Sequence, residues 1–147
     1  MSFKCHSERV TDCIELLGLN MFATSSLDGT IRIWSNDNFV LTAEFTDVDQ
    51  KKSEKNSNIN GVRVIDYTPE LGGCLVSTGY SSYVNVWSPG SSLSKSYVGR
   101  LEGHSAIVVC CKFFPLSYRC LSVDETGNMK IWDLRNLIAI QTIRNDG

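Results

Sequence analysis

The sequence predicts an all-β protein built from three similar units. A short run of alternating apolar and polar residues that ends in tryptophan occurs three times, and a hydroxyl side chain stands ten residues before each tryptophan. Alternation with a period of two is typical of a strand with one buried face. Repetition of this kind is typical of repeat proteins, whose units bury their faces against one another. The pairs are Trp34 with Thr24, Trp87 with Ser77, and Trp132 with Ser122.

Each unit is expected to contain four short strands, because apolar runs of strand length alternate with turn residues and helical periodicity is almost absent. In the first unit, Asp28 and Gly29 form a tight turn before the third strand. In the later units the gaps contain Pro69, Gly72, Gly73, Pro89, Gly90, Pro115 and Gly127. The predicted strands are residues 10–16, 21–25, 30–34 and 39–45, then 61–67, 75–79, 83–87 and 95–101, and finally 107–114, 119–123, 128–132 and 139–143.

These strands divide the chain into three blocks and one insertion. Residues 1–46, 61–101 and 102–147 form the units, and no strand of the fourth type precedes the first unit. The separations between successive tryptophans are 53 and 45 residues. The longer one indicates an insertion at 47–60, which is polar and lacks periodicity, as expected for a surface loop.

Composition and charge argue against several classes of partner. The formal net charge is −2, whereas nucleic acids and anionic membranes are bound by concentrated positive charge. No apolar run reaches the roughly 20 residues that span a bilayer, and the N-terminal residues lack the apolar core of a signal peptide. We therefore expect a cytoplasmic protein that binds neither nucleic acid nor membrane.

The six cysteines fit small buried thiols better than disulfides or metal ligands. Several of them lie in or beside apolar strands, and free cysteine in a reducing compartment behaves as a small apolar residue. No C-x-x-C spacing occurs, so we expect no metal site and no cofactor. The residues within or beside apolar runs are Cys13, Cys74, Cys110 and Cys120, and Cys111 adjoins one of them.

The third unit resembles a WD40 repeat. Gly103 and His104 open it, Ser122 lies in its second strand, and Trp132 and Asp133 close its third. The corresponding residues of the first unit are His6, Thr24, Asp28, Gly29 and Trp34. Each histidine stands 28 residues before its tryptophan. The resemblance covers nearly the whole chain and implies a partial β-propeller of about three four-stranded blades, an open segment of a larger propeller.

In WD40 proteins a histidine, a serine or threonine, an aspartate before the third strand and the tryptophan form a hydrogen-bonded tetrad that fixes the register of a blade. The resemblance implies a complete tetrad in the first unit: His6, Thr24, Asp28 and Trp34. The third unit supplies His104, Ser122 and Trp132, with Thr126 at the aspartate position. The second supplies Ser77 and Trp87, with Ser81 at the aspartate position and no histidine. We expect the second blade to be the least firmly held, because a buried polar network with missing members loses stability.

A narrower resemblance concerns the third unit alone. Residues 101–104, 122–127, 131–136 and 141–143 are similar to WD-repeat proteins of cilia and flagella. This resemblance implies a structural component of the axoneme or of another cytoskeletal, microtubule-associated assembly.

Three blades leave apolar faces open at both ends, because propellers generally contain about four to eight blades. The ring is then completed by further blades of a longer protein or by a partner chain, which includes a second copy of this one. Open apolar faces of this kind promote association.

No set of residues points to catalysis. Both histidines fall at tetrad positions, and a Ser-His-Asp arrangement around His104 would use residues already assigned to register. The leading interpretation is a non-catalytic scaffold that binds other proteins of a multi-subunit complex through its loops. The alternative is a substrate receptor of a cullin-type ubiquitin ligase, because residues 132–135 fit the core of the WD-x-Arg motif of such receptors. The candidate partner-binding residues are Lys51, Lys52, Lys55, Tyr80, Asp124, Glu125 and Arg135.

Overall fold

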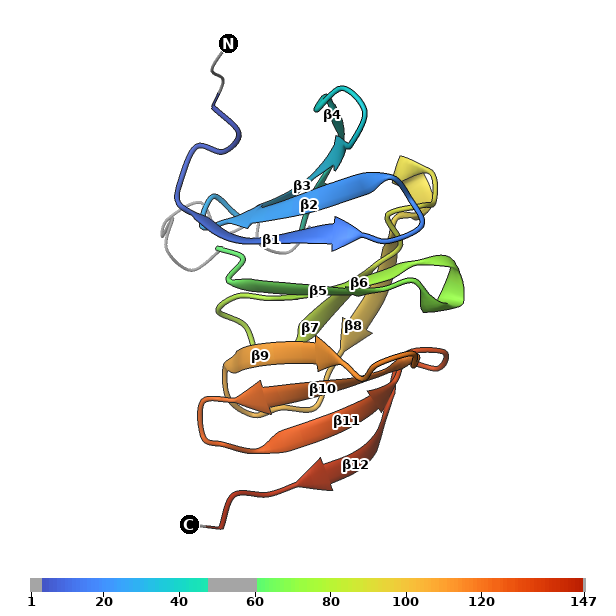
Figure 1. Cartoon of the computed structure of the whole chain (residues 1–147). Helices are drawn as coiled ribbons and strands as arrows, with labels where there is room; N and C mark the ends of the chain where they lie inside the picture. Colours follow the sequence, from blue (N-terminus) through green and yellow to red (C-terminus); the bar gives the residue numbers. More distant parts are fainter. Residues whose placement is uncertain (1–3, 48–60, 147) are drawn as a thin grey trace.

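Three four-stranded antiparallel sheets follow one another along the chain in the computed structural model, which describes residues 4–47 and 61–146 (Figure 1). Each sheet takes its four strands from one continuous stretch of sequence. Blade 1 contains β1 (Val10–Leu16), β2 (Met21–Ser26), β3 (Thr30–Ser35) and β4 (Leu41–Thr46). Blade 2 contains β5 (Val64–Thr68), β6 (Cys74–Thr78), β7 (Val84–Trp87) and β8 (Tyr97–Leu101). Blade 3 contains β9 (Val108–Phe113), β10 (Arg119–Asp124), β11 (Met129–Asp133) and β12 (Ile138–Ile143).

This arrangement confirms the predicted all-β class and its open, propeller-like form. The described residues form no α-helix, and their two short 3-10 turns are η2 (Glu70–Gly72) and η3 (Leu93–Lys95). Figure 1 shows the blades stacked from blade 1 to blade 3, so that the sheets do not close into a ring.

Three strands begin two or three residues later than the sequence predicts, and two of these delays have a local cause. Phe39 has a φ of 59° and belongs to the turn between β3 and β4, which the hydrogen bond from Ser35 N to Val40 O closes. A strand residue has a negative φ, so β4 begins only at Leu41. The chain before β8 forms η3, which delays that strand to Tyr97. The strand predicted from residue 61 begins at Val64.

Each blade has a face that carries its tryptophan, the Trp face, and an opposite face made of aliphatic residues. Directly paired residues of antiparallel strands lie on the same face. Phe22 pairs with Trp34 on the Trp face of blade 1, whereas Ala23 pairs with Ile33 on the opposite face. The pleat therefore sorts the side chains into two layers before any contact between blades forms.

The Trp face of one blade packs against the opposite face of the blade before it. The indole of Trp87 stacks on Phe45 of β4, with ring centroids 5.0 Å apart and planes 6° apart. Trp132 packs in the core cluster between blades 2 and 3, and the blade 2 residues of this cluster are Cys74, Val76, Val84, Val86 and Leu101. Each fully buried aliphatic side chain stabilises the fold by about 1.5–3 kcal/mol, so these two layers are the main source of cohesion between blades.

The cysteines fit the prediction of buried thiols only in part. Cys74, Cys111 and Cys120 are buried in the core between blades 2 and 3, and burial raises the pKa of each thiol, that of Cys74 to about 12. Cys13 and Cys110 are exposed, which corrects the expectation for these two. In each case the apolar run continues, but the alternation of the strand turns that side chain outward.

Among the described residues, no blade packs against the opposite face of blade 3. By register, the residues of this face include Leu121, Met129, Ile131 and Ile143. The corresponding residues of blade 1, namely Ala23, Ile31, Ile33 and Phe45, are at most 3% exposed, whereas Ile143 is 39% exposed. The face of blade 3 thus keeps the apolar character of a covered surface, which makes it prone to association.

We expect this chain to self-associate when it is expressed alone, because burial of the apolar opposite face of blade 3 against another copy is favourable. Sedimentation velocity should show oligomers whose amount falls in the double variant Ile131→Gln/Ile143→Gln. Leu116→Gln is the matched control, since Leu116 is 91% exposed in a turn away from this face. A monodisperse wild-type monomer that melts cooperatively would contradict the expectation.

Candidate functional site

One hydrogen bond recurs in all three blades. The indole Nε1–H donates to Thr24 from Trp34 over 3.0 Å, to Ser77 from Trp87 over 3.0 Å, and to Ser122 from Trp132 over 2.7 Å. The hydroxyl residue lies two positions along the hairpin from the direct partner of the tryptophan, for example Cys120 in blade 3. Diagonal neighbours share a face and lie within reach of a long aromatic side chain. The spacing of ten residues is therefore a consequence of hairpin register.

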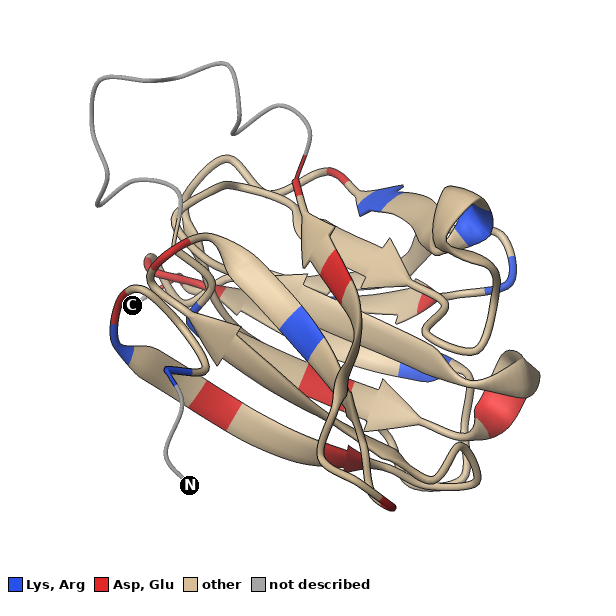
Figure 2. Cartoon of the chain, turned by 90° about the horizontal axis from the view of Figure 1, so that it is seen from above, with Lys and Arg blue, Asp and Glu red and all other residues tan. Residues whose placement is uncertain are grey.

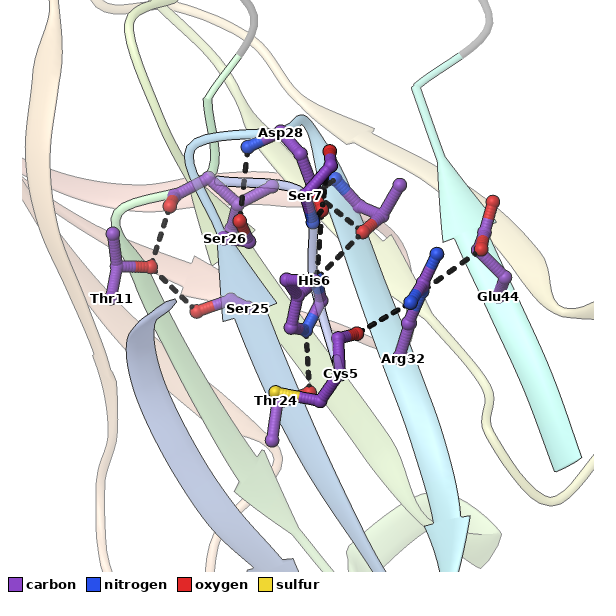
Figure 3. Close-up of polar contacts among 12 residues, drawn as sticks. Cys5, His6, Ser7, Thr11, Thr24, Ser25, Ser26, Asp28, Arg32 and Glu44 are labelled. Atoms are coloured by element: carbon purple, nitrogen blue, oxygen red, sulfur yellow. Dashed lines mark hydrogen bonds and ion pairs between the residues drawn. The ribbon is translucent and has the colours of Figure 1, made fainter. Parts of the chain in front are cut away.

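In blade 1 a histidine extends this bond into a longer network (Figure 3). His6 is 4% exposed, with Nε2 at 2.7 Å from the Thr24 hydroxyl and Nδ1 at 3.0 Å from Asp28 Oδ2. The hydroxyl and amide of Thr30 donate to Asp28 Oδ1 over 2.5 and 2.9 Å. The segment before β1 is thereby tied to the second strand and to the turn before the third.

Blade 3 contains the same network, with the carboxylate supplied from a different position. His104 Nε2 lies 2.6 Å from the Ser122 hydroxyl, and its Nδ1 lies 2.9 Å from Asp124 Oδ2. Thr126 donates through its hydroxyl and amide to Asp124 Oδ1, over 2.5 and 2.9 Å. The interpretation that the third tetrad lacks its acid is therefore wrong: Thr126 does hold the aspartate position, but Asp124, two residues earlier, provides the carboxylate.

The donors and acceptors fit a neutral imidazole in both networks. The serine or threonine hydroxyl accepts from the indole and therefore has its own proton to donate to histidine Nε2, while Nδ1–H donates to the carboxylate. Burial alone would raise the pKa of Asp124, but hydrogen bonds from Thr126, His104 and Asn128 outweigh it and hold that pKa at about 2. The pKa of Asp28 is lowered in the same way, against the effect of burial, by Thr30, His6 and Ser7.

Blade 2 uses a different network, centred on an aspartate from the end of blade 1. Asp47 is 5% exposed, and its carboxylate accepts hydrogen bonds from Tyr83 over 2.8 Å, Asn85 over 2.9 Å and Arg100 over 2.8 Å. The Arg100 guanidinium also lies 3.9 Å from the centroid of the Tyr83 ring. Burial raises the pKa of Tyr83 to about 12, and the Asp47 carboxylate adds to that shift. Asp47 was expected to be exposed at the start of a surface loop, and its burial corrects that expectation of exposure.

The structure separates the candidate partner-binding residues into three groups. Lys51, Lys52 and Lys55 lie outside the described residues. Asp124 is 2% exposed, which corrects its assignment to an exposed contact site. Tyr80, Glu125 and Arg135 remain accessible to different degrees: Tyr80 is half-buried beneath the Arg63 guanidinium, Glu125 is exposed, and the Arg135 side chain is half exposed.

Arg135 is held in place although it is exposed. Its guanidinium binds the Asp133 carboxylate over 3.1 and 3.3 Å and lies 3.9 Å from the centroid of the Tyr118 ring. The Asp133 side chain thereby orients the Arg135 guanidinium. The hydrogen bonds from Arg135 in turn lower the pKa of Asp133.

The group Ser122, His104 and Asp124 has the connectivity of a hydrolytic triad, but its surroundings favour a structural role. Ser122 is 0% exposed, and its hydroxyl oxygen already accepts the indole hydrogen bond. A nucleophile needs space within about 3 Å for a reacting atom, and the indole of Trp132 fills that space. Within residues 4–47 and 61–146, no group of three or more His, Cys, Asp or Glu residues could hold a metal ion. In the same ranges no helix has the length and apolar character needed to cross a membrane.

Sequence reasoning missed two acidic residues of these networks. Asp124 precedes the expected position by two residues, and the signal that could identify it is the Asp-x-Thr spacing shared by residues 28–30 and 124–126. Asp47 belongs to the network of the next blade, so no spacing within one unit could indicate it.

Buried histidine–hydroxyl–tryptophan networks on stacked four-stranded blades define a propeller of hydrogen-bonded repeats. The family described as "WD domain, G-beta repeat" matches residues 1–35 and 95–133, the segments that hold the two complete tetrads. This chain belongs to the WD40 repeat family.

Individual relatives have diverse roles. The chain is 32% identical over 130 residues to "Transcription initiation factor TFIID subunit 5" of Caenorhabditis elegans, covering 86% of this chain and 18% of that protein. It is 31% identical over 140 residues to "Probable coatomer subunit beta'" of Schizosaccharomyces pombe (90% and 16%). It is 23% identical over 136 residues to "Cilia- and flagella-associated protein 337 B" of Tetrahymena thermophila (92% and 10%). The chain thus spans less than a fifth of each of these relatives.

Among solved structures, the WD40 beta propeller domain of Doa1 superposes with a TM-score of 0.72 at 22% identity. The match covers 98% of this chain and 43% of that one, and it shows that the two share a fold.

We expect Asp124→Ala to lower the free energy of unfolding by about 2–4 kcal/mol, because it leaves the donors of the buried His104 and of Thr126 without their acceptor. Urea unfolding at fixed protein concentration measures the change. Glu125→Ala, which removes the exposed neighbouring acid, should stay within about 0.5 kcal/mol of wild type. Equal losses in the two variants would refute the role of Asp124.

The depressed pKa of Asp124 makes its contribution dependent on pH. An unfolded aspartate titrates near 3.9, so the stabilisation is complete above about pH 4 and is lost as the pH falls through about 2. The difference in unfolding free energy between wild type and Asp124→Asn should be constant from pH 7 to about pH 4 and shrink below it. A difference that stays constant down to about pH 2 would exclude the linkage.

Proposed function

We propose that this chain is a non-catalytic WD40 scaffold that binds other proteins in a multi-subunit complex. The observation that carries the proposal is the use of the buried polar groups: the histidines, their hydroxyl partners and the carboxylates of Asp28, Asp47 and Asp124 all hold strands in register. The loops at the two ends of the rigid blades remain accessible to a partner. Rigid scaffolds with exposed loops are typical of protein recognition.

The surface charge supports a protein partner over a polyanion. Figure 2 shows Lys and Arg interspersed with Asp and Glu along the ribbon of the described chain. Nucleic-acid and anionic-membrane surfaces are characterised by concentrated positive charge.

For the cellular setting we propose a structural component of a ciliary, axonemal or other cytoskeletal assembly in the cytoplasm. The support is the similarity to the Tetrahymena cilia- and flagella-associated protein, which extends over 92% of this chain. We further propose that the open faces of blades 1 and 3 are covered by other blades or by a partner chain.

The scaffold proposal is tested by affinity capture of the tagged full-length protein from its own cells, followed by mass spectrometry. A reproducible set of stoichiometric partners is expected, and imaging of the same tagged protein should place it at the axoneme or another cytoskeletal structure. The absence of any stoichiometric partner would refute the scaffold, whereas a purely diffuse or nuclear signal would refute the setting alone.

Arg135 supports a second candidate, a substrate receptor of a cullin-type ubiquitin ligase. Its guanidinium is oriented by Asp133 and Tyr118 yet half exposed, as a residue that engages a partner should be. Arg135→Ala should abolish recovery of ligase subunits in the same capture experiment, with Arg9→Ala as the exposed control. Unchanged recovery, or no ligase subunit with wild type, would remove this candidate.

A further inference from the structure

Each blade places a cation at its outer strands, and the three blades differ in how that cation is neutralised. In blade 1, Arg32 donates to Glu44 over 3.0 Å and to the carbonyl oxygen of Cys5 (Figure 3). In blade 2, Arg100 donates to Asp47 over 2.8 Å. A carboxylate of the chain itself therefore neutralises the cation in both.

Blade 3 has two cations at the corresponding place and no such carboxylate. Lys130 and Arg32 both stand two residues before the tryptophan, and the residue paired with Lys130 is Thr142, where blade 1 has Glu44. By the same register, Arg144 follows Ile143 where Thr46 follows Phe45. Within the described ranges, neither Lys130 nor Arg144 makes an ion pair. These positions therefore carry two positive charges in blade 3, whereas the corresponding pair in blade 1 is neutral.

A cavity of about 60 Å³ lies between these cations. Gly103 lies at its side, and its polar lining is formed by His104, Ser105, Asp124, Asn128, Lys130, Thr142 and Arg144. In blade 1 the Arg32 guanidinium donates hydrogen bonds both to Glu44 of β4 and to the carbonyl oxygen of Cys5. The Lys130 ammonium instead donates to Thr142 over 2.9 Å, and it lies 5.9 Å from the centroid of the Trp132 ring.

The acid at the back of this cavity is already engaged. Asp124 is 2% exposed, and its oxygens accept hydrogen bonds from His104, Thr126 and Asn128. Its single charge is shared with those donors, so the half-buried Lys130 and the exposed Arg144 retain the capacity to bind a further anion.

The cavity remains accessible when blades are added to the ring. It lies on the Trp face of blade 3, as the two-residue alternation from Trp132 to Lys130 requires. Blade 2 already packs against this face, and the lining residues all come from blade 3 and from the connection that precedes β9. A blade added to the opposite face of blade 3 would not cover it.

We propose that this cavity binds an oxyanion side chain, a carboxylate or a phosphate monoester, presented by a partner polypeptide. The partner's anion would take the place that Glu44 and Asp47 occupy in blades 1 and 2, with Lys130 and Arg144 as charged donors. Ser105 and Asn128 add neutral donors, which suits an anion with several oxygens. This inference rests on the proposed scaffold function and names the chemistry of one of its contacts.

Saturation-transfer difference NMR tests the site directly, since it detects weak ligands that exchange rapidly between the protein and solution. The probes are N-acetyl-glutamate amide and N-acetyl-phosphoserine amide, with N-acetyl-glutamine amide as the neutral comparison, all at one ionic strength. Saturation transfer to one or both anionic probes and not to the neutral one is expected. The probe with the lower Kd identifies whether a carboxylate or a phosphate is preferred.

The double variant Lys130→Gln/Arg144→Gln should raise the Kd of the preferred probe about fivefold or more, the loss expected for two solvent-accessible charge-assisted contacts. Arg9→Gln/Lys112→Gln is the matched control, because it removes the same charge from exposed positions elsewhere. Equal loss in both double variants, or no saturation transfer to either anionic probe, would overturn the proposal. These measurements need no partner protein, so their failure is distinct from a failure of partner capture.

Discussion

The hydrogen bond from each indole to a hydroxyl ten residues earlier is the interaction on which the rest of the structure depends. It joins the second and third strands of a blade on the face that packs against the preceding blade. The Trp87 indole that donates to Ser77 also stacks on Phe45 of blade 1. Register within a blade and contact between blades are thus set by the same side chain, because the bond fixes where the ring lies.

The hydrogen-bond network around the indole–hydroxyl pair differs among the blades, because the donors and acceptors that pair with the buried polar groups come from different positions in each blade. Blades 1 and 3 use a histidine and a carboxylate, and blade 2 uses Asp47 with Tyr83, Asn85 and Arg100. A buried polar group without a partner is costly, so loss of the histidine in blade 2 is compatible with the fold only where other donors and acceptors replace it. The family match covers the segments of the two histidine-containing tetrads, and of the blade 2 strands it includes only β8.

Much of this fold could be predicted from local pattern. The two-residue alternation and the tryptophan spacing indicated the strands, since both follow from pleat and hairpin register alone. The same reasoning failed for Asp124, because a turn can supply a carboxylate from more than one position while the hydrogen-bond geometry stays the same. It failed for Asp47 because that contact joins two blades. The cavity beside Lys130 depends on residues from three separate segments, and no spacing along the chain reveals such a site.

Hydrogen–deuterium exchange of the three indole N–H groups measures the central interaction most directly. If each indole donates to its buried hydroxyl, the Nε1–H groups of Trp34, Trp87 and Trp132 should exchange as slowly as the backbone amides of their own strands. Rapid exchange of any one indole, while the neighbouring strand amides stay protected, would contradict the account.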